Sequence, residues 1–256
     1  LKGGSGAEMT MNLPPEPEDP ALLERIRQSA ESALRAQDVH ALLRYQDFGG
    51  TPADRAAASA WLRDLVPDSD ADRVLVCPGI HGALLALVSL LARPGQLICV
   101  ESLGYPGMKA IAAQLGVQLF GLPMDDEGVS VRAFQDACRN LEPRALYLNP
   151  AIHNPTTITT SLARREALAD IAMHYSVPII EDDAYAALPT EPVTPLAQLA
   201  PALTYYVAGL SKCFGAGLRT AFVRAPDARQ AQRLAGALRA TTVMASPVTT
   251  AIATRA

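Results

Sequence analysis

The segment AGLSKCFGAGLRT, residues 208–220, places Lys212 in an apolar, glycine-rich stretch and adds Arg219 seven positions later. The residues before it, 204–210, are β-branched, aromatic and aliphatic, as in a buried strand. Lys212 is therefore expected at the carboxyl end of that strand, where open α/β sheets bind ligands. A lysine shielded from water loses proton affinity and can form a Schiff base with a carbonyl compound. The alternative is a lysine at an element end that keeps its charge in water.

A second strand-like segment, VPIIEDDAY, ends in the acids Glu181, Asp182 and Asp183 and continues to Tyr185. A carboxylate at the end of an apolar strand is costly to bury unless a cation partners it. We expect Asp182 to have such a partner. For Glu181 and Asp183, an exposed loop position is the simpler interpretation.

A glycine turn follows the predicted strand 73–77 and opens directly into a helix. The free N–H groups at such a helix start form an anion site, so Gly79, Ile80 and His81 are candidate phosphate ligands. Taken alone, the turn is more typical of an ordinary strand-to-helix connection than of a phosphate site.

Two further strand ends carry candidate residues. Tyr105 follows the predicted strand 96–101 in a turn, where its ring can lie on a planar ligand or can simply pack the turn. Asn154 follows the predicted strand 145–149 beside a proline, a pair that also initiates ordinary turns. Each signal is weak by itself.

Strands and helices alternate along the chain from about residue 73. The predicted strands are 73–77, 96–101, 117–122, 145–149, 177–182, 204–210 and 220–224, and the helical segments between them include 82–92, 107–116, 131–140 and 162–175. This order predicts an α/β fold, a three-layer α/β/α arrangement with a mostly parallel seven-stranded sheet. The last connection is too short for a helical crossover, so strand 220–224 is expected to run antiparallel.

Composition sets the class of protein. The chain has 256 residues, 49% of them hydrophobic, with a net charge of −4 and a pI near 5.6. Its charges are mixed in sign, so DNA contact is expected only through a segment that this chain does not contain. The longest apolar run, 83–92, is too short to span a bilayer, and no signal peptide opens the chain. We expect no membrane partner and a cytoplasmic location.

Four scattered cysteines, Cys77, Cys99, Cys138 and Cys213, form no CxxC pair. This pattern indicates reduced thiols, mostly buried, and neither a disulfide framework nor a metal site.

Taken together and in chain order, the candidate residues form a specific set. The glycine turn, Tyr105, Asn154-Pro155, Asp182-x-x-Tyr185, Ser211-Lys212 and Arg219 fall on successive strand ends. Over residues 12–250 this set resembles the large domain of class I/II aminotransferases of pyridoxal 5'-phosphate (PLP) fold type I. The resemblance implies PLP as the cofactor.

The resemblance also implies roles around the cofactor ring. Lys212 would form the Schiff base, Asp182 would pair with the pyridinium nitrogen, and Tyr185 with Asn154 would hold the phenolic oxygen. Tyr105 would stack on the ring. A carboxylate keeps that nitrogen protonated at neutral pH, which makes the cofactor an electron sink. Lys212, Asp182 and Tyr185 are therefore the catalytic candidates.

Ser211, Arg219 and the amides of residues 79–81 would bind the phosphate, for which a planar guanidinium is well suited. By the same resemblance, Tyr45 would reach the phosphate of a partner subunit in a homodimer. Gly209 stands where the family often has a serine, so one phosphate hydroxyl is expected to be missing.

The resemblance also bears on the ends of the chain. LKGGSGAE is linker-like, and residues 12–20 are a proline-rich arm before the helical segment 21–36. We expect an N-terminal linker, arm and first helix over residues 1–40 and the PLP-binding large domain over residues 41–256. Family members add a small C-terminal domain with an arginine for the substrate carboxylate. Arg255 is not in a matching context, so that domain is expected to be absent.

Two functions fit the resemblance. One is transamination of an amino acid or amine. Four segments, LLRYQDFGG, CPGIHGAL, SLGYPG and GLSKCF, are also similar in sequence to the aminotransferase-like domain of MocR-type regulators in the GntR superfamily. This resemblance implies that PLP, or its adduct with an amino compound, acts as a signal. A decarboxylase or lyase on the same fold remains a third possibility.

Overall fold

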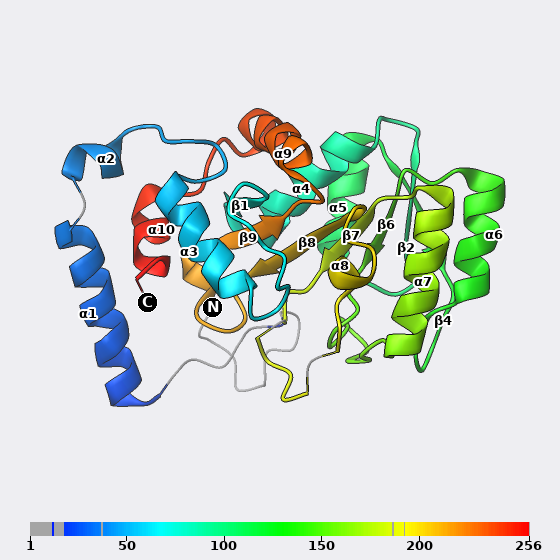
Figure 1. The fold of residues 1–256 in the computed structure, drawn as a ribbon, viewed down its shortest axis with the longest axis horizontal. Helices are drawn as coiled ribbons and strands as arrows, with labels where there is room; N and C mark the ends of the chain where they lie inside the picture. Colours follow the sequence, from blue (N-terminus) through cyan, green and yellow to red (C-terminus); the bar gives the residue numbers. More distant parts are fainter. Residues whose placement is uncertain (1–11, 13–17, 37, 186, 192, 256) are drawn as a thin grey trace, which may run out of the picture.

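Seven strands form one sheet in the order β1-β9-β8-β7-β6-β2-β3. The computed structural model describes residues 12, 18–36, 38–185, 187–191 and 193–255. Helices cover both faces of the sheet, which confirms the predicted three-layer α/β/α arrangement (Figure 1).

The observed strands lie within the predicted ranges, each trimmed by one or two residues. They are β1 (Val74–Cys77), β2 (Leu97–Glu101), β3 (Gln118–Leu122), β6 (Ala145–Leu148), β7 (Ile179–Asp182), β8 (Thr204–Gly209) and β9 (Ala221–Arg224). Strand β9 runs antiparallel to β8, as its short connection predicts, and antiparallel to β1 as well. The pairs from β8 across to β3 are parallel.

Alternating side chains of the strands supply two packed faces. On one face pack α4 (Gly79–Leu91), α5 (Pro106–Leu115) and α9 (Ala228–Thr241). On the other pack α3 (Pro52–Leu62), α6 (Val131–Leu141), α7 (Leu162–Tyr175) and α8 (Leu196–Leu199). In β1, Leu75 and Cys77 belong to the first face and Val74 and Val76 to the second, as expected for a strand buried on both sides.

Helix α1 (Pro20–Ala36) lies at one end of the molecule beside α10 (Pro247–Ala253), and only Ala33 of α1 is buried (Figure 1). The remaining elements are α2 (Val39–Leu43), the 3₁₀ turn η1 (Ala216–Leu218) and the hairpin β4 (Met124–Asp125) with β5 (Gly128–Val129). Residues 1–8 and 13–17, which carry the predicted linker and most of the proline-rich arm, lie outside the described residues.

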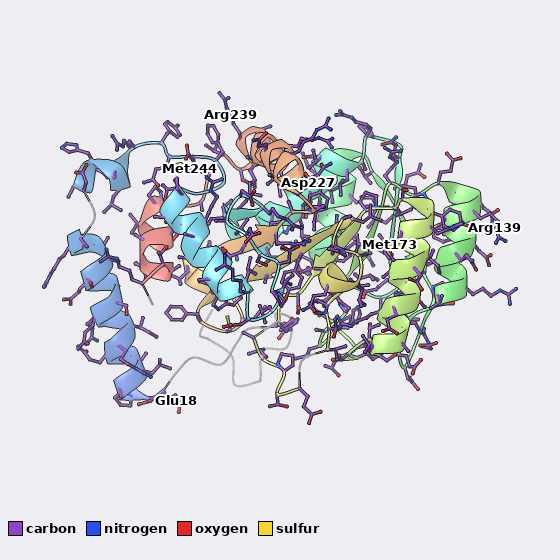
Figure 2. All side chains as sticks on the ribbon, viewed as in Figure 1. Glu18, Arg139, Met173, Asp227, Arg239 and Met244 are labelled. Atoms are coloured by element: carbon purple, nitrogen blue, oxygen red, sulfur yellow. The ribbon has the colours of Figure 1, made fainter. Side chains whose placement is uncertain are left out.

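The segment between α2 and α3 is held against the far end of α9. The Gln46 backbone N–H lies 3.3 Å from the Met244 sulfur, and the Arg239 guanidinium lies 5.0 Å from the Phe48 ring centroid, a cation–π distance. Figure 2 labels Met244 and Arg239 on this part of the molecule. These contacts hold the backbone that directly follows Tyr45.

The four cysteines are free, and three of them, Cys77, Cys99 and Cys138, are buried, while Cys213 is exposed. Burial raises the pKa of Cys99 to about 12, so this thiol stays protonated. Among the helices that the structure describes, none is long and apolar enough to cross a membrane.

Candidate cofactor site

Asp182 is the last residue of β7 and is only 4% exposed. Its Oδ2 accepts a hydrogen bond of 2.8 Å from the Tyr147 hydroxyl, while its buried Oδ1 has no partner among the described residues. Burial raises the pKa of Asp182 to about 7, against the hydrogen bond from Tyr147. Among the described residues, this buried carboxylate has no cationic partner.

The neighbouring acids are also buried, which corrects the expectation that Glu181 and Asp183 are exposed. Glu181 is 0% exposed. Arg165 Nη1, 3.3 Å from its Oε1, and the backbone amides of Leu196 and Ala197 stabilise the buried carboxylate. Asp183 is 7% exposed, accepts a 2.7 Å hydrogen bond from Tyr206, and feels the charge of Arg165. Both side chains thus lie on the face of β7 that packs near Arg165.

Lys212 lies just beyond β8, as predicted, and is partly buried. Its ammonium donates to the backbone oxygen of Asn12, and the Asn12 side-chain amide in turn donates to the Tyr185 hydroxyl at 2.5 Å. Partial burial lowers the pKa of Lys212, which increases its neutral, nucleophilic fraction. Asn12 therefore joins the lysine to one of the predicted ring contacts, a role that no sequence signal indicated.

The two aromatic candidates face the same acid. Burial raises the pKa of Tyr185 and of Tyr105, and in both cases the charge of Asp182 raises it further. Asp182 therefore lies close enough to both hydroxyl groups for its charge to act on them. The Tyr105 hydroxyl also lies 3.3 Å from His81 Nδ1, which links it to the start of α4.

The start of α4 and Arg219 form a cradle suited to an anion. Gly79 has φ +78°, and a Cβ built there would lie 2.8 Å from Arg219 Nη2. The helix cap Pro78 forms no side-chain hydrogen bond with the first turn. Arg219, itself at φ 47°, therefore turns its guanidinium over the helix N-terminus, where a phosphate would be held by both.

Asn154 is half-buried, and its backbone amide is fixed by Asn149 Oδ1 at 2.8 Å. Asn149 also reaches the backbone oxygen of Asp182 at 2.6 Å. The predicted contacts Asn154 and Asp182 are thus tied to one side chain. Asn149 could not be identified from the sequence, because it is expected only as the last residue of the strand 145–149.

Three further residues are expected to bind a phosphate. Ile80 lies in the first turn of α4 and packs its side chain toward Gly209, which leaves its backbone amide as the expected ligand. Ser211 is half-buried, and its hydroxyl has no partner among the described residues. Tyr45 is 80% exposed, in the segment between α2 and α3. Within one chain, Tyr45 has no role in the site.

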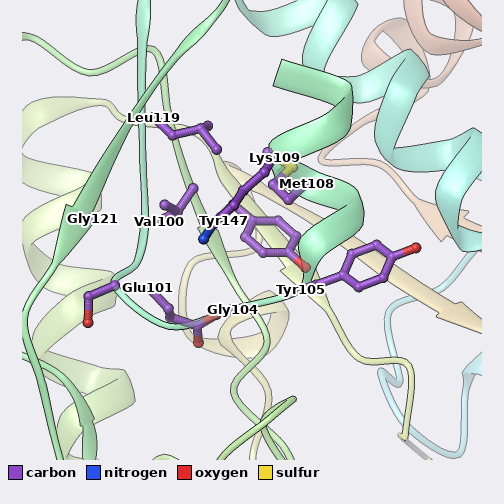
Figure 3. Close-up of a pocket in the computed structure, with 10 residues that line it drawn as sticks. Val100, Glu101, Gly104, Tyr105, Met108, Lys109, Leu119, Gly121 and Tyr147 are labelled. Carbon is purple, nitrogen blue, oxygen red and sulfur yellow. The ribbon is translucent and has the colours of Figure 1, made fainter. Parts of the chain in front are cut away.

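A cavity of about 270 Å³ adjoins the site between α5 and the ends of β2 and β3. Figure 3 shows Lys109 extending from α5 into this cavity and the Tyr105 hydroxyl pointing away from it. The cavity shares Tyr105 and Tyr147 with the candidate site, but Lys212 does not line it. It is therefore a neighbouring hollow and not the space around the reactive lysine.

The sequence matches the family model for aminotransferase class I and II over residues 8–256. The chain belongs to the class I and II aminotransferases. This membership confirms the resemblance drawn from the ordered residues and, with it, the expectation of PLP as the cofactor of this aminotransferase domain.

Known proteins similar to the domain fall into two groups. The HTH-type transcriptional regulator YdeF of Bacillus subtilis, itself uncharacterized, is 34% identical over 180 residues, which are 67% of this chain and 39% of YdeF. The 2-aminoadipate transaminase of Thermus thermophilus is 29% identical over 217 residues, 79% of this chain and 52% of that protein. The aminotransferase domain therefore spans about two fifths to one half of the length of these relatives.

A solved structure shows the same fold with a bound cofactor derivative. The α-aminoadipate aminotransferase LysN of Thermus thermophilus, complexed with N-(5'-phosphopyridoxyl)-L-leucine, matches with a TM-score of 0.85 and 25% identity. The match covers 95% of this chain and 62% of LysN.

The residues of this domain fit PLP by their own chemistry. The buried carboxylate of Asp182, whose Oδ1 has no partner among the described residues, suits a pyridinium, and the Arg219 cradle suits a phosphate. The chain has three lysines, Lys2, Lys109 and Lys212, and of the two that the structure describes only Lys212 contacts Tyr185 through Asn12.

Proposed function

We propose that this domain binds PLP through a Schiff base to Lys212 and that the whole protein transfers amino groups from an amino acid or amine. The observation that carries the proposal is Asp182, a buried acid with a raised pKa and no cation at the end of the strand next to that of Lys212. Bound PLP would supply an electron sink for the carbon that bears the amino group.

Each residue then has a task of its own. Asp182 keeps a proton on the ring nitrogen, because a carboxylate out of water stabilises an adjacent cation. Tyr185 and Asn154 hold the phenolic oxygen, and Tyr105 covers the ring. The amides of residues 79–81, with Arg219 and Ser211, fix the phosphate. Lys212, as a neutral amine, would accept and return a proton at the carbon that bears the amino group.

The test is spectroscopic. Purified protein mixed with PLP should develop a visible absorption band, and addition of a panel of L-amino acids should shift that band for at least one of them. Formation of pyridoxamine phosphate and the matching keto acid identifies transamination; release of carbon dioxide or of an elimination product would instead indicate a decarboxylase or lyase. No spectral change with PLP would contradict the proposal.

A second candidate function is supported by the regulators among the relatives. YdeF and YjiR of Escherichia coli, which is 27% identical over 178 residues, are both uncharacterized HTH-type transcriptional regulators. In that case the domain senses PLP or its adduct with an amino compound, and DNA is bound elsewhere. Sequencing the coding region upstream of Leu1 separates the two, because a helix-turn-helix in the same frame favours the regulator.

We also propose a homodimer in which Tyr45 of each subunit reaches the phosphate of the other. The exposure of Tyr45, together with Leu43 at 80%, supports an interface on this segment. The free, largely buried thiols fit a reducing compartment, so the proposed location is the cytoplasm.

A further inference from the structure

Asn149 follows β6 directly and is 3% exposed. Its backbone N–H lies 3.0 and 3.1 Å from the two carboxylate oxygens of Glu101, itself 5% exposed. His153 Nε2 lies 3.4 Å from Glu101 Oε2. The backbone of Asn149 is therefore anchored from the side of β2.

The Asn149 side chain bonds in two directions. Its Nδ2 donates to the backbone oxygen of Asp182 at 2.6 Å, and its Oδ1 accepts from the backbone N–H of Asn154 at 2.8 Å. The last paired residues of β6 and β7 are Leu148 and Glu181. The Asn149 side chain thus extends the pairing of β6 and β7 by one residue. It also connects these two strands to the loop that carries Asn154.

The chemistry of this position requires a carboxamide. The Asp182 oxygen needs a donor and the Asn154 amide needs an acceptor, and a carboxamide offers both from one rigid plane. An aspartate at position 149 would keep the acceptor and lose the donor. A leucine would lose both, although its shape is similar, and would leave buried polar groups unpaired.

We propose that Asn149 is a positioning residue, which holds Asp182 and Asn154 at the spacing that the cofactor ring requires. This role rests on the proposed binding of PLP. Asn149 touches neither the ring nor the substrate in this role, and it acts through the backbones of its two neighbours. It is distinct from the ring contacts themselves, which Asp182 and Asn154 supply with their side chains.

The test is a double-mutant cycle on the affinity for PLP. Asn149→Leu, Asn154→Ala and the double variant are titrated with PLP beside the wild-type chain, and urea unfolding without cofactor records stability separately. Asn149→Leu should weaken PLP binding at least tenfold. In the Asn154→Ala background it should weaken binding much less, because the Asn154 side chain that Asn149 positions is already absent. Asn149→Asp, which keeps the acceptor, should lie between the wild-type protein and Asn149→Leu.

Gln198→Leu is the matched control, since it removes an exposed carboxamide that donates to the Leu65 backbone oxygen at 3.2 Å. It should leave PLP affinity unchanged. Independent effects of Asn149→Leu and Asn154→Ala, or an unchanged affinity in Asn149→Leu and Asn149→Asp, would overturn the positioning role. If Asn149→Leu does not fold, Asn149→Asp decides alone: because it loses only the donor to Asp182, it should weaken PLP binding, and by the same factor with or without Asn154→Ala. Failure of the wild-type chain to bind PLP would instead overturn the proposed function.

Discussion

At the scale of single residues, the site is defined by which buried charges have partners. Four acids near the strand ends are buried: Glu101, Glu181, Asp182 and Asp183. Arg165 lies 3.3 Å from Glu181 and its charge favours the ionised form of Asp183, while His153 Nε2 lies 3.4 Å from Glu101. Asp182 has a tyrosine hydroxyl and no cation among the described residues. Since isolated buried charge is strongly unfavourable, this acid indicates a cationic ligand.

The first prediction compares the two adjacent aspartates. Asp182→Ala should weaken PLP binding about 10- to 100-fold, because a hydrogen bond to a charged group contributes about 1.5–3 kcal/mol. Asp183→Ala removes a side chain that contacts Tyr206 and should change PLP affinity much less, even if it lowers stability. Titration with PLP followed by absorbance measures both, and equal losses in the two variants would refute the distinction.

The second prediction concerns the pH dependence of stability in protein prepared without PLP. Folding raises the pKa of Asp182 from 3.8 to about 7, so the folded chain keeps a proton that the unfolded chain has lost. The contribution of this group to stability is therefore present below about pH 4 and is lost as pH rises toward 7. The loss is at most about 1.4 kcal/mol per pH unit.

Asp182→Asn removes this titration and keeps the other acids, including Glu181, whose pKa burial also raises to about 7. Between pH 5 and 7 the free energy of unfolding of Asp182→Asn should therefore rise relative to that of the wild-type chain. Urea unfolding at several pH values provides the comparison. Parallel pH profiles for the two proteins would show that Asp182 does not titrate in this range.

At the scale of elements, much of the fold could be predicted because strand composition and helix periodicity are local properties. All seven strands of the sheet and the antiparallel direction of β9 follow from the sequence. The hairpin β4–β5 could not be predicted, because its strands have only two residues each. The burial of Glu181 and Asp183 depends on Arg165 and Tyr206, which are distant in sequence and give no local signal.

The same limit applies to the site. Residues on strand ends, such as Lys212, Asp182 and Tyr105, could be placed because parallel strands end at one edge of the sheet. The contributions of Asn12 and Asn149 could not, since each acts through backbone groups brought close only by the folded chain.

The third prediction tests why β8 ends in Gly209 where the family often has a serine. A Cβ at this position would lie 3.0 Å from Ile80 Cγ1 and 3.2 Å from the Thr220 backbone oxygen. Gly209→Ser should therefore lower stability by about 1–3 kcal/mol, as overpacking does, without improving PLP affinity. Gly236→Ser, where nothing lies within 4 Å of the added Cβ, is the control for urea unfolding. A gain in PLP affinity would show that the serine hydroxyl can still reach the phosphate.

At the scale of the whole molecule, the site is incomplete in one chain if Tyr45 belongs to it. Tyr45 is 80% exposed and lies in a segment fixed by Gln46 and Phe48. A symmetric dimer would bring this segment to a partner, as the proposed shared site requires.

The fourth prediction is complementation between two defective variants. Lys212→Ala cannot form the Schiff base, and Tyr45→Phe should bind PLP more weakly because it lacks the phosphate hydroxyl. Mixed subunits should regain tight PLP binding in up to about one quarter of all sites, the share expected for random dimers with one intact site each. A monomeric mass by light scattering, or no recovery after mixing, would contradict the shared site.

The central claim is that Lys212 is the residue that holds the cofactor. The direct measurement is borohydride reduction of the PLP-loaded protein, followed by digestion and mass spectrometry of the labelled peptide. The chain has only three lysines, so the label can be assigned without ambiguity. The account predicts a single phosphopyridoxyl group on the peptide that contains Lys212, and loss of the label and of the visible band in Lys212→Ala but not in Lys109→Ala. A label on Lys2 or Lys109, with an unchanged band in Lys212→Ala, would contradict it.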